Sequence, residues 1–542
     1  MAAARGLQQT DAASFMWPGV FRRISESACI ERPTSTMSSF RPEYIHDIPR
    51  YWAAQTPDAP CLHENGAVIS YGELWRRIEA ARDWLAAQGV GEGDRVMVVG
   101  ENCNEMVVTL FASSLLHAWP IQVNARLSAR EIDNIRDHAQ PALVLFTGHV
   151  SDVAAAHGER LGAQATGCPV FDAGMRVVRA ATAPQREPAG LARSVATLIY
   201  TSGTTGAPKG VMVPHAGLTQ FARISATSRD MGPADVAYGA LPMSHIFGIA
   251  TVLMATLYAG ASLFLRPRFD ANEVFESLAS PGVTILQGVP TMFTRIMAVA
   301  PTVGAKPGAY PRLRYLYTGG APLDPTLKRE VETLFGQALH HGYGITEYAG
   351  SLFITRMEAP RADCSAGYIV EGVEIEITDA EGKLLPAGER GQIRVRGPGV
   401  MLGYYRNPEQ TAEALLPGGW LNTGDLGYLD ADGALFISGR SKDLIIRSGF
   451  NVYPIEVESV INAFPGVRQS AVVGRTTGDG NEEVVAFIEM QDGAELDRKA
   501  LDTYLRESLA PYKRPAELRT VDVIPTTASG KLLKQPLRAM LD

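Results

Sequence analysis

The sequence predicts an α/β protein, in which a large N-terminal domain of doubly wound α/β subdomains and a β-rich subdomain precedes a small, mobile α+β domain. Three observations predict this class. Helix and strand patterns alternate up to about Asp363, which is typical of a mainly parallel sheet. Beyond that point, strands with alternating side chains are separated by turn residues. At 542 residues, the chain also exceeds what one hydrophobic core usually organises.

The elements of the first half are predicted from helix caps and apolar spacing. Ser70 and Glu73 have the spacing of a capping box, and apolar residues at helical spacing follow them. Ser128 and Glu131 repeat this spacing and open a second helix of the same kind. The other elements predicted here are the strand Arg95–Val99, the helix Met106–His117, a short strand at Ile121–Val123 and the strand Ala142–Phe146.

The second half continues the alternation and then changes character. Residues 148–191 are rich in Ala and Gly, weakly patterned, and expected to be peripheral. A run of twenty uncharged residues, Ile246–Leu265, is interrupted by Gly and Thr, so it predicts a buried helix and a strand at Ala261–Leu265 and no transmembrane segment. The remaining predicted elements are strands at Val195–Tyr200, Thr284–Gln287, Tyr315–Thr318, Val373–Thr378, Gln392–Arg396, Gln469–Val473 and Glu483–Glu489, and helices beginning at Pro290, after Pro454 and near Leu501.

Composition restricts the class of protein. Fifty basic residues against 58 acidic ones give a net charge of −8, and this does not support nucleic-acid binding through a global basic field. Five scattered cysteines without a CxxC pair argue against a disulfide framework and favour a cytoplasmic location. The histidines show no metal-binding spacing, and the N-terminus lacks the apolar core of a signal peptide. We expect residues 1–39 to be a poorly ordered extension, residues 40–441 the large domain and residues 442–542 the small mobile one.

The stretch Thr201–Gly210 carries the clearest chemical signal. It follows the buried strand Val195–Tyr200, and within six positions it offers four hydroxyls and two glycines. Glycines allow a ligand to approach the backbone closely, and free N–H groups with hydroxyls and Lys209 form a site for an anion. The order Pro-Lys-Gly differs from the Walker pattern, so a polyphosphate is expected in a loop of another type.

The run Leu198–Gly210 resembles the phosphate loop of the adenylate-forming superfamily, which includes acyl-CoA synthetases, luciferases and the adenylation domains of peptide synthetases. Five further segments match this superfamily in order, from about Phe40 to the end, and the chain is most similar to fatty or aromatic acid–CoA ligases. The resemblance implies the adenylate-forming enzyme fold. It also implies that ATP is bound by Thr201, Ser202, Gly203, Thr204, Thr205, Gly206 and Lys209.

Two further segments resemble those that line the acyl pocket. Leu241–Gly248 contains His245 and Phe247, and it lacks the aspartate with which relatives hold an amino-acid substrate. In Thr318–Pro322, the resemblance places Gly319 at the acyl pocket and Gly320, Ala321 and Pro322 beside adenine. Ile345 and Tyr348 complete the suggested pocket. These residues include no cation, so we expect an apolar or aromatic monocarboxylic acid and not a dicarboxylate.

The remaining segments carry the implied catalytic groups. His341–Glu347 resembles the "YGxTE" motif, in which Tyr343 and Gly344 lie at adenine, Thr346 donates to the α-phosphate and Glu347 holds Mg²⁺. The resemblance further implies roles for the residues that follow: Asp425 at the ribose, Arg440 at the ribose or phosphates, Lys442 as hinge, Ser448, Gly449 and Phe450 in the CoA tunnel, and Lys531 as a mobile catalytic lysine together with Thr346 and Glu347.

The sequence thus predicts an ATP-dependent carboxylic acid:CoA ligase that uses Mg²⁺ and coenzyme A and releases AMP and pyrophosphate. One alternative is an adenylating enzyme that passes the acyl group to a carrier-protein thiol or to an oxidative step. The other is a nucleotide-binding regulator without turnover. For the oligomeric state, which the sequence leaves open, a homodimer is the expectation.

Overall fold

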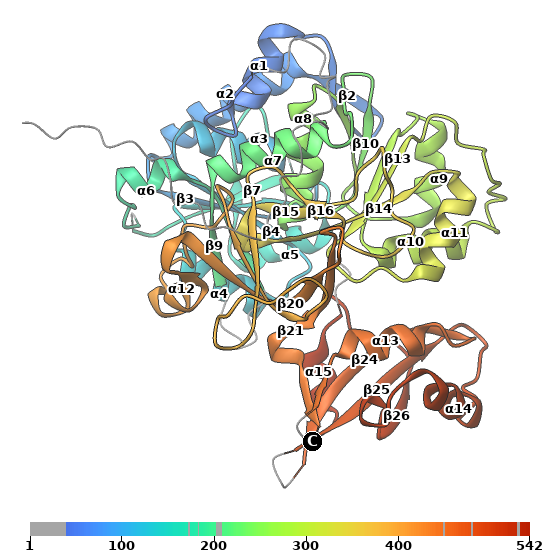
Figure 1. Cartoon of the computed structure of the whole chain (residues 1–542). Coiled ribbons are helices and arrows are strands. Elements are labelled where there is room, and N and C mark those ends of the chain that lie inside the picture. The colour runs from blue at the N-terminus through green and yellow to red at the C-terminus, as the bar shows by residue number, and fades with distance from the viewer. Residues whose placement is uncertain are drawn as a thin grey trace, which may run out of the picture. The chain divides into compact units, whose positions relative to one another are not determined.

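The computed structural model describes residues 40–171, 174–182, 184–201, 209–447, 450–477, 481–527 and 532–541 (Figure 1). The predicted extension, residues 1–39, lies outside these ranges. The elements confirm the predicted mixed α/β class, with a nine-stranded sheet built mainly from parallel strands, a five-stranded sheet with equal numbers of parallel and antiparallel pairings, and further sheets that are antiparallel or mixed.

A nine-stranded sheet positions most of the candidate site. Its strand order is β16-β15-β14-β13-β12-β10-β11-β1-β2. Neighbouring strands from β14 to β1 are parallel, while β2, β15 and β16 pair in antiparallel fashion. The strands are β1 (Pro60–Glu64), β2 (Ala67–Ser70), β10 (Val236–Gly239), β11 (Ser262–Leu265), β12 (Ile285–Gly288), β13 (Tyr315–Gly319), β14 (Leu339–Ile345), β15 (Gly350–Ile354) and β16 (Tyr368–Ile369).

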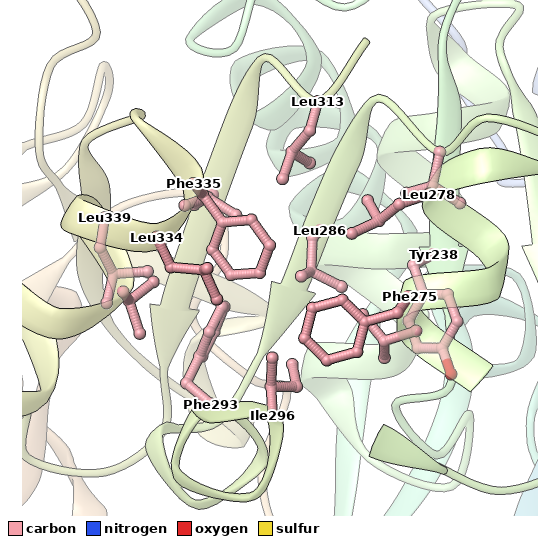
Figure 2. Packing of buried hydrophobic residues seen from close by; sticks show 14 of the residues in the cluster. Tyr238, Phe275, Leu278, Leu286, Phe293, Ile296, Leu313, Leu334, Phe335 and Leu339 are labelled. Carbon is pink, nitrogen blue, oxygen red and sulfur yellow. The ribbon is translucent and has the colours of Figure 1, made fainter. Parts of the chain in front are cut away.

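Three helices pack an aromatic core against this sheet (Figure 2). They are α9 (Ala271–Ala279), α10 (Pro290–Val299) and α11 (Pro325–Phe335), which contribute Phe275, Phe293 and Phe335. The rings of Phe275 and Phe335 stack with centroids 6.4 Å apart. Because β12, β13 and β14 are parallel neighbours, their C-terminal residues share one edge of the sheet, where ligands of α/β sheets commonly bind.

A five-stranded sheet, ordered β4-β3-β5-β7-β6, holds the first predicted strands. It consists of β3 (Arg95–Gly100), β4 (Trp119–Asn124), β5 (Leu143–Thr147), β6 (Gln164–Ala165) and β7 (Met175–Arg179). The weakly patterned region therefore supplies the last two strands at one edge of the sheet. The helices in this part of the chain are α1 (Asp47–Gln55), α2 (Tyr71–Ala87), α3 (Asn104–Leu115), α4 (Ala129–Ala139) and α5 (Asp152–Arg160).

The two predicted capping boxes differ in the structure. At Ser128, both hydrogen bonds of the box form, because the Glu131 carboxylate returns to the Ser128 N–H at 2.8 Å. At Ser70, the side chain accepts from the N–H of Glu73, but the Glu73 carboxylate pairs with Arg77 and Arg76 instead. Two nearby arginines thus compete successfully with the backbone for this carboxylate.

The uncharged run does not form a single long α-helix. Phe247–Met254 is a π-helix, which continues as α8 (Ala255–Tyr258) and is followed by β11, so the predicted helix and strand are confirmed. Among the described residues, no helix combines the length and the apolar character needed to cross a membrane. The π-helix begins at Phe247, in the segment assigned to the acyl pocket, and such wide turns often occur at functional sites.

Two antiparallel regions carry other parts of the site. The hairpin of β8 (Val195–Thr201) and β9 (Lys209–Pro214) flanks the predicted phosphate loop and confirms the predicted strand. It lies between α6 (Ala189–Ser194) and α7 (His215–Thr227). The predicted β-rich region forms a sheet of β17 (Glu374–Thr378), β18 (Gly391–Arg396), β19 (Leu415–Leu416), β20 (Trp420–Leu429) and β21 (Leu435–Arg440), with α12 (Pro408–Ala414) before β19.

The C-terminal residues form α+β structure with cores of their own. Two hydrophobic clusters consist only of residues from Ile445 onward. The elements are β22 (Ile445–Arg447), β23 (Phe450–Val452), α13 (Pro454–Asn462), β24 (Val467–Thr476), β25 (Glu482–Met490), α14 (Arg498–Ser508), β26 (Glu517–Val521) and α15 (Lys534–Ala539). The boundary at residues 441 and 442, and the mobility of this part, stay predictions.

Candidate active site

A buried aspartate, Asp425, anchors a polar group that three strands bring together. Asp425 on β20 lies opposite Arg440 on β21, and the Arg440 Nε is 3.1 Å from its Oδ1. The hydroxyl of Tyr343, at the end of β14, donates to its Oδ2 at 2.6 Å. Asp425 is only 5% exposed, so these two partners offset the cost of burying its charge. Segments 82 residues apart, predicted at adenine and ribose, therefore meet at one carboxylate.

The electrostatics of this group fix its charge states. Burial, followed by the charge of Asp425, raises the pKa of Tyr343 well above its usual value, so its hydroxyl keeps its proton. Burial opposes the charge of Arg440, yet Asp425 and Glu347 together raise its pKa. The site thus holds a neutral donor and a permanent cation beside one carboxylate.

Glu347, the predicted Mg²⁺ ligand, is held by a residue outside the predicted motifs. Glu347 lies in the short helical turn Thr346–Tyr348 after β14. The hydroxyl of Tyr404 donates to its Oε1 at 2.9 Å. Burial and the nearby Glu347 raise the pKa of Tyr404, so it remains a donor. Tyr404 stands in Gly403-Tyr404-Tyr405-Arg406, and nothing in that pattern alone indicated a partner 57 residues earlier.

The two described ends of the phosphate loop lie in register across the hairpin. Thr201 pairs with Lys209, and residues 202–208 between them lie outside the described residues. The Lys209 Nζ is 5.2 Å from the centroid of the Tyr404 ring, a cation–π distance. Tyr404 therefore joins the phosphate-loop lysine to Glu347. Of the predicted loop residues, Ser202, Gly203, Thr204, Thr205 and Gly206 are not described.

Lys442, the predicted hinge, follows Arg440 by two residues in the turn Ser441–Asp443. Burial lowers its pKa, and the charges of Arg440 and Lys209 contribute to the lowering. Lys209 and Lys442 are thus close enough for their positive charges to repel each other. The neighbouring Asp443 is bound by α15, where the Nη2 of Arg538 donates to the Asp443 Oδ1 at 2.8 Å.

The suggested acyl pocket has an aromatic wall. The rings of Phe247 and Tyr317 meet edge to face, with centroids 5.8 Å apart. A methyl group placed on Gly320 would lie 3.8 Å from Phe247 and 3.7 Å from Val289, so this glycine borders the same wall. Gly320 also has φ +77°, where L side chains are strained. Gly319 and Ile345 end the parallel neighbours β13 and β14.

The other suggested pocket residues have different surroundings. Burial lowers the pKa of His245 to about 4, so its ring is neutral near pH 7. The ring of Tyr348 packs against Gly399, and its hydroxyl end packs against Gly397. At the adenine segment, the Nε2 of His341 lies 3.4 Å from the carbonyl of Ala321, which ties the end of β13 to β14. Among the described contacts, none of the Pro322 side chain bears on its predicted role, and Gly344 has no side chain to place.

A buried cation, Arg229, lies behind the aromatic wall and was not expected. Its guanidinium is 4.5 Å from the centroid of the Tyr317 ring, and its Nη1 donates to Gln287 Oε1 at 2.5 Å. No carboxylate pairs with it among the residues that the structure describes. The residues suggested from the sequence include no cation, but the structure therefore places a positive charge one ring away from them.

The side chain of Asn102 holds the segment Leu241–Gly248, which is predicted to line the acyl pocket. Its side-chain amide donates to the carbonyls of Gly239 and Leu241 at 3.2 and 2.9 Å, and its carbonyl accepts from the N–H of Met243 at 2.9 Å. Asn102 is 3% exposed, so the three hydrogen bonds satisfy a buried amide. A lone Asn in a turn gives no such indication in the sequence.

The predicted thiol-path residues are only partly described. Ser448 and Gly449 lie outside the described residues, as does the predicted catalytic lysine, Lys531. Phe450 is described; it is largely exposed and stacks on Tyr512 with centroids 4.7 Å apart. On either side of Lys531, Thr526 and Leu532 form a β-bridge.

The fold and the grouping of these residues define an adenylate-forming enzyme. The family model of the AMP-binding enzymes matches residues 49–405, and that of the AMP-binding enzyme C-terminal domain matches residues 456–531. The chain belongs to the AMP-binding enzyme family.

Named relatives and solved structures extend over nearly the whole chain. A feruloyl-CoA synthase of Amycolatopsis sp is 35% identical over 489 residues, 90% of this chain and 96% of that protein. A 4-coumarate–CoA ligase of Oryza sativa subsp. japonica is 32% identical, over 95% of this chain and 97% of that one. The crystal structure of ATP-bound MatB from Rhodopseudomonas palustris has a TM-score of 0.80 at 30% identity, covering 92% of this chain and 99% of that one.

Proposed function

We propose that this AMP-forming acid–thiol ligase joins a carboxylic acid to coenzyme A in two steps, through an acyl-adenylate. The observation that carries the proposal is the convergence of Lys209, Glu347, Asp425 and Arg440 through Tyr343 and Tyr404. These residues come from segments whose sequence resemblance assigns them to one nucleotide. Lys209, Tyr404 and Glu347 form one group of contacts and Tyr343, Asp425 and Arg440 form another, and the attraction between Glu347 and Arg440 links the two groups.

The nucleotide would be held at its ribose by Asp425. A carboxylate accepts hydrogen bonds from two neighbouring hydroxyls well, and Arg440 and Tyr343 keep this carboxylate oriented. Tyr343, Gly344, Gly320, Ala321 and Pro322 would border adenine. The phosphate loop, Thr201–Gly206 with Lys209, would take the phosphates.

Glu347 suits Mg²⁺, which binds through one or two carboxylates and the phosphates of its substrate. Its Oε1 accepts from Tyr404, which leaves lone pairs of the second oxygen available for a metal. Bound there, Mg²⁺ supplies positive charge at the reacting phosphate. Tyr404 would be a positioning residue: it orients the Glu347 carboxylate, while Lys209 packs on its ring.

The first step brings two anions together, since the carboxylate of the acid attacks the α-phosphate of ATP. The bond to that phosphorus forms as the bond to pyrophosphate breaks. Catalysis must position the anions and stabilise the charge that develops on the phosphate oxygens. Thr346, the amides of the loop and Lys531 would provide these donors.

The second step needs a path for a thiol, which displaces AMP from the acyl carbon. We propose that the chain turns at Lys442, which withdraws Lys531 and brings Ser448, Gly449 and Phe450 to the thiol path. Rotations of this kind commonly gate two-step reactions.

The homodimer and the cytoplasmic location stay predictions of the sequence.

We propose an aromatic or apolar monocarboxylic acid as substrate. The edge-to-face pair of Phe247 and Tyr317 supports a flat aromatic group, because aromatic rings favour such neighbours. The names of two relatives, a feruloyl-CoA synthase and a 4-coumarate–CoA ligase, also point to aromatic acids.

A panel of acids tests the function directly. Release of AMP would be measured for aromatic, fatty and dicarboxylic acids, with free CoA, with a carrier protein, and without a thiol. We expect aromatic monocarboxylic acids to support AMP release that needs free CoA. Release that needs a carrier protein would favour the first alternative. ATP binding without pyrophosphate exchange for any acid would favour a regulator.

A further inference from the structure

A second cluster of reactive side chains lies outside the nucleotide site. Cys103 immediately precedes α3, Glu105 lies in the first turn of that helix, and His149 follows β5. One potential ligand atom from each residue, a sulfur, an oxygen and a nitrogen, lies within 4.8 Å of the other two. Cys103 is fully buried and Glu105 nearly so, while His149 is partly exposed.

We propose that Cys103, Glu105 and His149 bind one divalent transition-metal ion, most suitably Zn²⁺. Thiolate, imidazole and carboxylate are the ligand types that Zn²⁺ takes, whereas Mg²⁺ prefers oxygen alone. A thiolate and a carboxylate carry two negative charges, which one divalent ion neutralises. Burial of the whole set then costs less than burial of either anion by itself. This site is therefore distinct from the Mg²⁺ site proposed at Glu347.

The distances allow such a centre with small adjustments. Zinc bonds of about 2.0–2.3 Å in a tetrahedral arrangement place ligand atoms roughly 3.3–3.8 Å apart. The separations within the cluster reach no further than 4.8 Å. The His149 Nε2 and Glu105 Oε2, now 2.9 Å apart in a hydrogen bond, would move apart by less than about 1 Å.

A neighbouring carboxylate independently indicates that the cluster binds a ligand. Glu64 is 8% exposed, and its Oε2 accepts from the N–H of Asn104 at 3.0 Å. Its Oε1 has no hydrogen-bond partner among the described residues, nor has the Oδ1 of Asn104. Glu64 is within electrostatic range of all three proposed ligands. A water in the fourth position of the metal would donate to Glu64 Oε1, which is the arrangement expected of a three-ligand site.

The location gives the site a structural consequence. Cys103 and Glu105 lie one and three residues after Asn102, whose side chain binds the carbonyl of Leu241 and the N–H of Met243. A metal that ties this part of the chain to His149 would fix the segment that carries His245 and Phe247. The inference does not depend on which acid or thiol the enzyme uses.

Cobalt binding to the full-length protein tests the site. Purified protein is first treated with a chelator and then titrated with Co²⁺ in the presence of excess Mg²⁺, and absorption is followed. We expect a thiolate-to-cobalt band that saturates at about one Co²⁺ per chain, and a rise of Tm by several degrees. Cys103→Ser should abolish the band. Cys168→Ser is the matched control, because Cys168 is also buried but lies outside the cluster.

A second variant keeps the test decisive if Cys103→Ser does not fold. His149 is partly exposed, so His149→Gln should fold and should weaken Co²⁺ binding by at least about tenfold. The proposal is overturned if the parent protein shows no thiolate band, which would mean a hydrogen-bonded trio without a metal. A band that persists unchanged in His149→Gln, or that Cys168→Ser removes, would overturn it equally.

Discussion

The proposed nucleotide side and the proposed acyl side of the site are stabilised by different kinds of interaction. Around Asp425, charged and polar groups are joined by short hydrogen bonds from three strands. Around Phe247, the neighbours are an aromatic ring, a valine and a glycine with positive φ. Directional bonds specify one ligand closely, whereas an apolar wall accepts related shapes. We therefore expect changes on the nucleotide side to affect every acid equally and changes on the acyl side to alter the choice of acid.

The largest effect is expected for Lys531→Ala. Loss of this cation should reduce adenylate formation by about 10²–10³-fold for every acid, as when one transition-state donor is removed. Conversion of supplied acyl-adenylate to the thioester should be unaffected. Pyrophosphate exchange and single-turnover thioester formation measure the two steps separately. An equal loss in both steps would contradict the proposed turn at Lys442.

Asp425→Asn should raise the KM for ATP by about tenfold or more, because a charged hydrogen-bond partner contributes about 1.5–3 kcal/mol. The ratio of kcat/KM between any two acids should stay constant. Initial rates with two aromatic acids of different size measure both quantities. A change in acid preference would show that the two sides are coupled.

Tyr404→Phe should raise the Mg²⁺ concentration needed for half-maximal rate by about fivefold to tenfold, since one hydrogen bond to Glu347 is lost. Tyr405→Phe is the matched control, because the Tyr405 hydroxyl donates to Glu187 at 2.7 Å, away from Glu347. Initial rates against Mg²⁺ concentration distinguish the two variants. Equal shifts in both would argue against a positioning role for Tyr404.

Phe247→Ala should lower kcat/KM for aromatic acids by about threefold to tenfold, since aromatic pairs contribute about 0.5–1.5 kcal/mol. Short aliphatic acids and the KM for ATP should change little. Competition between an aromatic and an aliphatic acid in one reaction gives the ratio directly. A uniform loss over all acids would mean that Phe247 supports the fold and not the choice of acid.

The smallest effect concerns His245 and pH. Its pKa is about 4 in the folded protein, below its ordinary value of about 6.5, so the unfolded chain binds more protons between these values. Its contribution to stability is therefore complete above about pH 6.5 and is lost as pH falls towards 4. His245→Gln should lessen the pH dependence of urea unfolding in this window. An unchanged dependence would mean that this ring is hydrated and titrates normally.

The strands and the order of motifs could be predicted from the sequence because they depend on local pattern. The strand predicted at Tyr315–Thr318 is observed at Tyr315–Gly319, and that at Thr284–Gln287 at Ile285–Gly288. Local pattern did not reveal the competition for Glu73, because the outcome depends on which arginine rotamers reach its carboxylate.

The candidate site could be assigned where a motif was recognisable, but its cross-links could not. The side chains of Tyr404, Arg229 and Asn102 interact with residues at least 22 positions away, so no short pattern contains both partners. Arg229 is informative in this respect. A buried arginine at the end of a helix is indistinguishable from a solvated one until the fold places Tyr317 and Gln287 beside it.

The pairing of Asp425 with Arg440 across two adjacent strands has a consequence for the order of events. Lys442 comes only two residues after Arg440, so torsions that change at Lys442 leave both partners in the sheet where they are. The ribose would then stay bound to Asp425 while the residues after Lys442 rotate. AMP would remain bound until the thioester has formed, and its release would be the last step of the cycle.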